Sequence, residues 1–432
     1  MPQRRNIDEQ QLLEKAKRYF PGGTLGNTRF SDELSFVVKA GKGSKVYDMS
    51  GNEYIDYLLG SGPMILGHAH PAVVAAVRDY LERGSTYFTL NEPAINLAEA
   101  ICQAVPCAEK IRFCSTGSEA TFFALRVART FTKKDKILKF EGGYHGSHDY
   151  ALMSSSPSVP KDFPQAVPDS AGIPRVLEDQ VLIAPFNDLE TTSALLERHH
   201  HELGGVIVEP FQRIITPRPG FLQGLRQVTQ RFAVPLIFDE VVTGFRLAWG
   251  GAQEYYGVVP DLAAYGKIIG GGYPLSAVVG RADMMEAFNP DREASGEFIA
   301  QTGTLNGNPV AAVAGLATLQ QLQRAGTYRQ LFGTGHALRQ GLVDLLKRYG
   351  IPGRVVGEDP LFDVVFTDEP VNDYRGVLTQ NRELLRRFNA ELLKRGILKG
   401  SSKMYMSVAH TSADVEQTLT AVREAFAVMT AA

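Results

Sequence analysis

The chain has 432 residues, 44% of them hydrophobic and 21% charged, which is typical of a globular protein with room for two or three domains. Its 45 Lys and Arg against 47 Asp and Glu give a formal charge of −2, so we expect neither a nucleic-acid nor a membrane partner. No apolar run is long enough to span a membrane, and the three cysteines fit no disulfide framework and no zinc motif. We therefore expect a cytoplasmic protein without a metal site.

The first predicted element is an amphipathic helix over residues 7–20, which ends at Pro21 and is too polar for a signal peptide. A β-hairpin over residues 44–58 follows. From about residue 70, helices alternate with short strands that are apolar on both faces, a pattern that predicts a mostly parallel sheet wrapped by helices. The elements expected there are helices at 71–83, 92–104, 118–131 and 220–232 and strands at 111–114, 136–140, 205–210 and 234–240.

Residues 153–180 interrupt this alternation with prolines and serines, and we interpret them as a loop that closes over a site. A helix at 310–325 then leads into strands and helices over 350–430. We expect residues 66–309 to form a large domain, and residues 1–65 and 310–432 to form together a smaller one.

Lys267 and Asp239 are the most informative residues for chemistry. Lys267 lies in Gly-Lys-Ile-Ile-Gly-Gly-Gly (266–272), where glycines allow a flat ligand to approach the amine. Asp239 ends an apolar strand, as Glu209 ends another, and ligands of parallel sheets bind at such strand ends. Enzymes bind pyridoxal 5′-phosphate (PLP) through a lysine that forms a Schiff base and a carboxylate that pairs with the pyridine nitrogen. The pair Lys267 and Asp239 therefore predicts this cofactor.

Three glycine-containing segments could complete the site. Thr116, Gly117 and Ser118 lie at a strand-to-helix junction whose free N–H groups suit a phosphate. The alternative is that Ser118 merely caps the helix. Glycines around Tyr144 and His145 leave both rings free to lie flat on a ligand, and Thr304 in the polar loop 301–309 is a second candidate for phosphate contact.

In this order and spacing, the motifs resemble class III aminotransferases, which are fold-type I PLP enzymes, over nearly the whole chain. The segments that carry the resemblance are 62–71, 139–146, 238–246 and 266–272. The resemblance implies an α/β fold with a mainly parallel, seven-stranded type of sheet in the large domain and a smaller α+β domain from both termini. It also implies a homodimer with shared active sites. The cofactor residues that it implies are Lys267 for the Schiff base, Asp239 for the ring nitrogen, Val241 and Tyr144 for the ring faces, Thr116, Gly117 and Ser118 for the phosphate, Thr304 for the phosphate of the neighbouring subunit, and Glu209.

Within the family, the chain most resembles glutamate-1-semialdehyde aminomutase and the transaminases related to it. Its departures from the aminomutase pattern lie where substrate binds: residues 24–28, 86–90, Ile214 and 402–407. These departures favour an aminotransferase acting between a carboxylate-bearing amine, with a β-amino acid among the candidates, and a keto acid. The alternative is the aminomutase itself, and a third possibility is a catalytically silent binding protein. Candidate clamps for the substrate carboxylate are Arg29 and Arg213.

Overall fold

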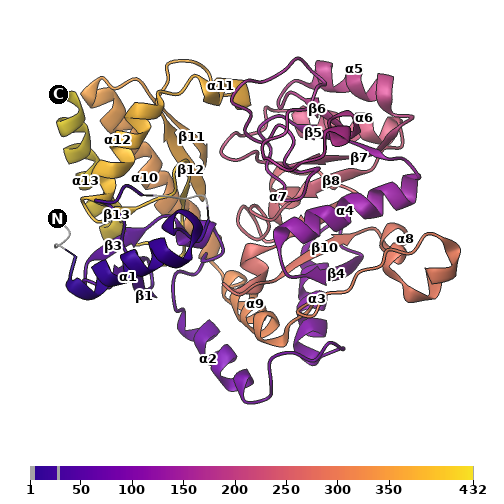
Figure 1. The fold of residues 1–432 in the computed structure, drawn as a ribbon, viewed down its shortest axis with the longest axis horizontal. Helices are drawn as coiled ribbons and strands as arrows, with labels where there is room; N and C mark the ends of the chain where they lie inside the picture. The colour runs from indigo at the N-terminus through magenta and orange to yellow at the C-terminus, as the bar shows by residue number, and fades with distance from the viewer. Residues whose placement is uncertain (1–4, 27–29, 432) are drawn as a thin grey trace. The chain divides into compact units, whose positions relative to one another are not determined.

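The computed structural model describes residues 5–26 and 30–431, which divide into two compact units (Figure 1). The central unit comprises Ala72–Arg324 and Val371–Leu378. The terminal unit comprises the described residues up to Pro71, Ala325–Pro370 and those from Thr379 onward.

The central unit is built on a seven-stranded sheet with the order β4-β10-β9-β8-β7-β5-β6. Strands β5 to β9 run parallel, while β10 is antiparallel to both of its neighbours, β4 and β9. All residues of β6 to β9 are buried, as a sheet covered on both faces requires. The predicted mainly parallel sheet is confirmed. The strands are β4 (Lys110–Cys114), β5 (Lys136–Phe140), β6 (Val181–Ala184), β7 (Leu203–Val208), β8 (Leu236–Asp239), β9 (Leu262–Tyr265) and β10 (Ser276–Gly280).

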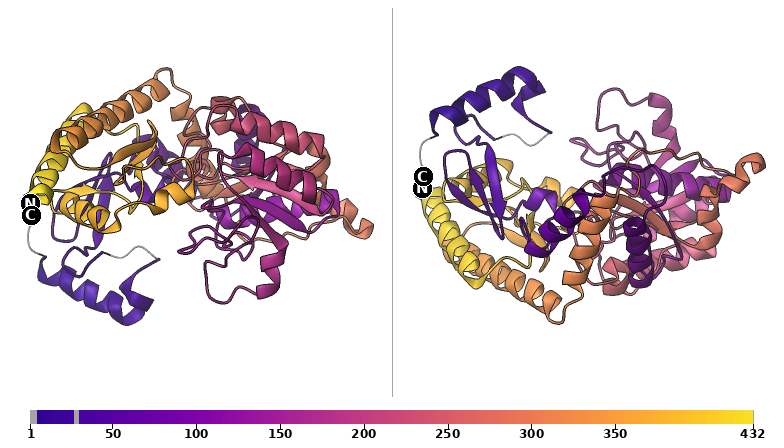
Figure 2. Two further views of the ribbon diagram at one scale, coloured as in Figure 1. Left: turned by 90° about the horizontal axis from the view of Figure 1, so that it is seen from above. Right: turned by 90° about the horizontal axis from the view of Figure 1, so that it is seen from below.

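Helices surround this sheet (Figures 1 and 2). Helix α4 (Gly117–Thr132) packs against β7, β9 and β10 with a face of small and aliphatic side chains, while α5 and α6 pack against each other. The other helices of the unit are α2 (Pro71–Leu81), α3 (Glu92–Ala104), α5 (Leu189–His199), α6 (Phe221–Arg231), α7 (Gly251–Tyr256), α8 (Ala282–Met285), α9 (Pro309–Leu322) and α11 (Tyr374–Leu378).

Helix α9 belongs to the central unit, whereas the sequence analysis placed residues from 310 onward in the smaller domain. The helix is apolar almost all round, and it packs between α3 and the short helix η4 (Lys267–Gly270). Gly315 permits this approach, because a Cβ there would stand 2.0 Å from the carbonyl oxygen of Ile269. The packing of α9 thus supports the backbone that carries Lys267.

The terminal unit contains two small sheets and four long helices. The four-stranded sheet has the order β1-β2-β3-β13, and the C-terminal strand β13 joins β3 in parallel. Helix α13 packs against α10 and α12. The elements are β1 (Val38–Lys42), β2 (Lys45–Asp48), β3 (Glu53–Asp56), β11 (Arg354–Glu358), β12 (Leu361–Val365), β13 (Ile397–Leu398), β14 (Met404–Tyr405), α1 (Ile7–Tyr19), α10 (Thr327–Tyr349), α12 (Arg382–Leu393) and α13 (Ser412–Thr430).

No helix in the described part of the chain combines the length and apolar character that crossing a bilayer demands. Within residues 5–26 and 30–431, no cluster of His, Cys, Asp and Glu side chains could hold a metal ion.

Candidate active site

Three ionisable residues meet at the carboxyl ends of neighbouring strands in the central unit. Glu209 directly follows β7 and Asp239 ends β8, and the parallel pairing of Val208 with Phe238 places both at one edge of the sheet. Asp239 in turn pairs with Ala264 on β9, three residues before Lys267. The sheet register therefore brings together the three residues that the sequence singled out.

Lys267 lies at the start of η4 with a backbone φ of 50°, in the left-handed region that non-glycine residues rarely adopt. Burial lowers the pKa of its ammonium group, while the carboxylates of Asp239 and Glu209 act in the opposite direction. A lowered pKa makes the unprotonated, nucleophilic amine easier to reach near neutral pH. The environment of Lys267 therefore suits attack on a carbonyl carbon.

Asp239 is buried and is held from two sides. Its Oδ2 lies 2.8 Å from Nδ1 of His145, and its Oδ1 accepts a hydrogen bond of 3.1 Å from the backbone N–H of Val241. The sequence analysis grouped His145 with Tyr144 as a ring free to lie on a ligand, whereas the structure places His145 against the carboxylate of Asp239. Because His145 is buried against the carboxylate, it fixes the orientation of Asp239.

The first turn of α4 is capped by a side chain and also leaves backbone N–H groups free. A capping box closes the helix, but its cap is Thr116 rather than Ser118, with Glu119 as the reciprocal partner. The box satisfies the N–H groups of Ser115, Thr116 and Glu119. Within the described chain, the N–H groups of Gly117 and Ser118 stay without a hydrogen-bond partner, so they can hold an anion at the positive end of the helix.

Tyr144 lies beside this turn, on the segment 141–148. Its N–H donates to Glu209 Oε2 at 3.0 Å, and the next turn is anchored where Ser147 N–H donates to Ser118 Oγ at 3.0 Å. Tyr144 as a whole is 41% exposed, and the guanidinium carbon of Arg213 lies 5.5 Å from the centroid of its ring. Arg213 therefore lies within the candidate site. Arg29, the other proposed clamp, falls outside the described residues.

Two glycines of the candidate site pack closely against Val241. A Cβ at Gly117 would stand 2.9 Å from Val241 Cγ1, and one at Gly266 would stand 3.3 Å from the same atom. Only glycine keeps the backbone this close to Val241 on both sides. The residues present, a buried carboxylate, a partly buried lysine and two free N–H groups at the start of a helix, fit PLP.

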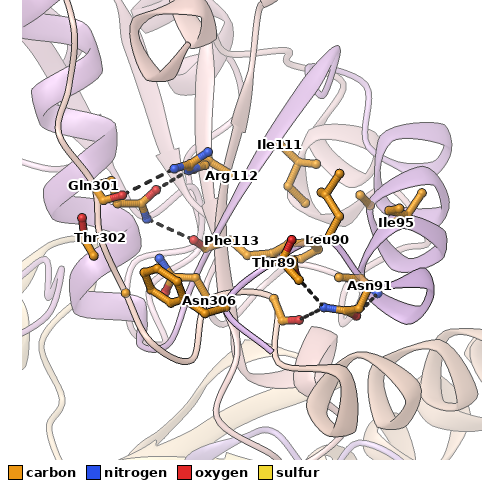
Figure 3. Close-up of a pocket in the computed structure, with 15 residues that line it drawn as sticks. Thr89, Leu90, Asn91, Ile95, Ile111, Arg112, Phe113, Gln301, Thr302 and Asn306 are labelled. Atoms are coloured by element: carbon orange, nitrogen blue, oxygen red, sulfur yellow. Dashed lines mark hydrogen bonds between the residues drawn. The ribbon is translucent and has the colours of Figure 1, made fainter. Parts of the chain in front are cut away.

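The loop that contains Thr304 lines a different pocket, of about 480 Å³, shown in Figure 3. Two segments face each other across it, and the side chain of Asn91 joins them by donating to Gly307 O at 3.0 Å. Gln301 ties the loop to β4 by donating to Phe113 O at 3.0 Å. The pocket lining is formed by Phe88, Thr89, Leu90, Asn91, Ala94, Ile95, Ala98, Ile111, Arg112, Phe113, Gln301, Thr302, Gly303, Asn306 and Gly307.

A fully buried lysine, Lys139, lies close to Asp239 and Glu209 of the candidate site. Lys139 on β5 is fully buried, and its ammonium group donates to Ala151 O at 2.7 Å, Met153 O at 2.6 Å and Ser155 Oγ at 2.9 Å. All three acceptors lie at the start of the irregular segment 151–169. Lys139 therefore anchors the base of the predicted closing loop.

Lys139→Met should change how stability depends on pH. Burial lowers the pKa of Lys139 to about 7, so between about pH 7 and 10.5 the unfolded chain holds a proton that the folded protein lacks. Stability then rises with pH in this window, by at most about 1.4 kcal/mol per unit from this group. Urea unfolding of the variant from pH 7 to 10 should show a flatter rise. Lys136→Met, on the same strand but half-exposed, is the control, and equal slopes in both variants would contradict the prediction.

Comparisons with known proteins agree with this geometry. The family model for class III aminotransferases matches residues 28–425. A glutamate-1-semialdehyde 2,1-aminomutase of Methanothermobacter thermautotrophicus is 42% identical over 424 residues, which cover 97% of this chain and 98% of the relative. An ω-transaminase structure from Sphaerobacter thermophilus is 35% identical with a TM-score of 0.92 and 97% coverage of both chains. A transaminase structure with PLP bound is 27% identical, with a TM-score of 0.89 and coverage of 98% and 97%. The chain therefore belongs to the class III aminotransferases, and it is an enzyme with pyridoxal 5′-phosphate as its cofactor.

Proposed function

We propose that this enzyme moves an amino group within a small carboxylate-bearing substrate, as a glutamate-1-semialdehyde 2,1-aminomutase. The observation that carries the proposal is the run of curated relatives with this activity, which are 39% to 42% identical over 95% to 97% of the chain. The sequence analysis ranked transfer between molecules first and the aminomutase second. The comparisons favour the second of these.

Each site residue then has a proposed task. Bound PLP supplies an electron sink for the carbanion that forms at the substrate carbon next to nitrogen. Lys267 would hold the cofactor covalently, and its free amine would be the base that moves a proton at that carbon. Asp239 keeps the pyridine nitrogen protonated, since its carboxylate is the negative charge at the end of β8. His145 holds that carboxylate in place.

The remaining residues bind and orient. Val241 and Tyr144 flank the cofactor ring, and Glu209 fixes Tyr144 through its backbone N–H. The first turn of α4, at Thr116, Gly117 and Ser118, holds the phosphate. Arg213 and Arg29 are the proposed partners of the substrate carboxylate, because a guanidinium group can bind it with two parallel hydrogen bonds.

Transfer between molecules is the second candidate, because two observations favour it. The ω-transaminase from Sphaerobacter thermophilus shares 35% identity and the fold over 97% of the chain. The substrate-contact positions 24–28, 86–90 and 402–407 also depart from the aminomutase pattern, and buried Ile214 stands beside Arg213 where the aminomutase has an asparagine. An aminomutase must retain its diamine between two half-reactions, so altered substrate contacts would favour release.

One experiment separates the two activities. With glutamate-1-semialdehyde as the sole substrate, we expect sustained formation of 5-aminolevulinate over many turnovers and no need for a keto acid. Product should be followed by a colorimetric assay and the cofactor by its visible absorbance. If the enzyme instead stops after one equivalent per site, and an amino acid substrate turns over only when a keto acid is added, the aminomutase is wrong and the aminotransferase is supported.

We further propose a homodimer in which Thr304 reaches the phosphate site of the other subunit. Its support is the exposed apolar surface beside the loop 301–307, where Phe88 is 69% exposed and Leu90 85%.

We also propose that the central and terminal units are the large and small domains, and that the protein is cytoplasmic, in keeping with three free cysteines.

A further inference from the structure

The segment 371–378 belongs to the central unit, although the chain on both sides of it belongs to the terminal unit. Three contacts hold it there. Asn187 Nδ2 donates to Asn372 O at 2.7 Å, and the hydroxyl of Tyr374 donates to Pro157 O at 3.0 Å. Tyr374 also covers Gly142 so closely that a Cβ at Gly142 would stand 2.6 Å from Tyr374 Cβ. The segment is therefore docked on Asn187 and on parts of residues 141–163.

Arg375 makes the strongest contacts of this segment. Its Nε donates to Glu141 Oε2 at 2.8 Å and its Nη2 to Glu141 Oε1 at 3.2 Å, which is a two-pronged ion pair. The same Nη2 donates to Lys161 O at 2.7 Å, and the guanidinium carbon lies 4.4 Å from the ring centroid of Phe163. One side chain thus joins Glu141 to the 161–163 part of the predicted closing loop.

Glu141 opens the segment that carries Tyr144 and His145. Its side chain is buried, so the carboxylate depends on Arg375 to offset its desolvation. Its backbone oxygen accepts from Gln212 Nε2 at 2.8 Å, and the N–H of Gly142 donates to Ser154 O at 2.8 Å. Gln212 and Ser154 therefore hold the backbone of this turn. Arg375 adds the contact that comes from the C-terminal part of the chain.

We propose that Arg375 is a positioning residue that acts through Glu141. It holds the turn of Tyr144 and His145 in place and ties residues 161–163 to that turn, so the two segments are ordered together. The proposal rests on the assignment of Tyr144 and His145 to the cofactor site made above.

The test compares Arg375→Gln, Glu141→Gln and the double variant. Two readouts are used: the rate at which PLP is released from the holoenzyme, and the rate at which trypsin cuts after Lys161 in the apoenzyme. We expect each single variant to raise both rates about tenfold, as loss of a charge-assisted hydrogen bond would. The double variant should do no more than Arg375→Gln alone, since that variant already removes the ion pair with Glu141.

Arg375→Lys should fall between the wild type and Arg375→Gln, because an ammonium group keeps the charge but cannot span both carboxylate oxygens. Arg386→Gln, which breaks an exposed pair with Glu383, is the matched control and should change neither rate. Additive effects of the two single variants, or unchanged cutting after Lys161, would overturn the proposal. The trypsin readout needs no cofactor and no turnover, so it stands even if the proposed reaction is wrong.

Discussion

Lys267→Ala should lower turnover at least about 10⁴-fold, because it removes both the covalent attachment and the base at the substrate carbon. Borohydride reduction followed by peptide mapping should place the cofactor on Lys267 in the parent enzyme and on no residue in the variant. Since Lys267 is only partly buried and no ion pair within the described chain fixes its ammonium group, its loss should leave the fold intact by circular dichroism. Lys110→Ala, at an exposed pair with Glu286, is the control and should keep full activity. Turnover at the parent rate in Lys267→Ala, with label on another lysine, would remove the central assignment.

Asp239→Asn should reduce turnover by about 10²- to 10⁴-fold with little loss of stability. The asparagine keeps the shape of the side chain and can still meet His145 and the N–H of Val241, but it cannot hold a positive charge on the pyridine nitrogen. Steady-state rates and urea unfolding should be measured on the same preparations. If activity is unchanged, the ring nitrogen is not charged by this group. If rate and stability fall together, Asp239 serves the fold instead.

Residues at strand ends could be predicted from the sequence, because an apolar run that ends in a carboxylate is a local signal. Glu209 and Asp239 lie at neighbouring strand ends, as expected. Strands β9 and β10 were not predicted, since Leu-Ala-Ala-Tyr and Ser-Ala-Val-Val-Gly are short and rich in small residues that carry little strand preference.

Contacts between distant parts of the chain left no such local signal. His145 and Asp239 are 94 positions apart, and Glu141 and Arg375 are 234 apart. Neither pairing follows from any spacing or periodicity. At the start of α4, a local sequence motif predicted the correct turn but not the correct capping residue. Only the structure shows that Thr116 caps the helix and that the N–H groups of Gly117 and Ser118 stay free.

The course of the chain through segment 371–378 also bears on biosynthesis. A ribosome releases the strands of the seven-stranded sheet, β4 to β10, well before Arg375 emerges. Until then Glu141 lacks its cation, and β3 likewise lacks its parallel partner β13. Closing such distant contacts is slow and comes late in folding. The nascent enzyme should therefore acquire its sheet during translation and a competent cofactor site only near the end of synthesis.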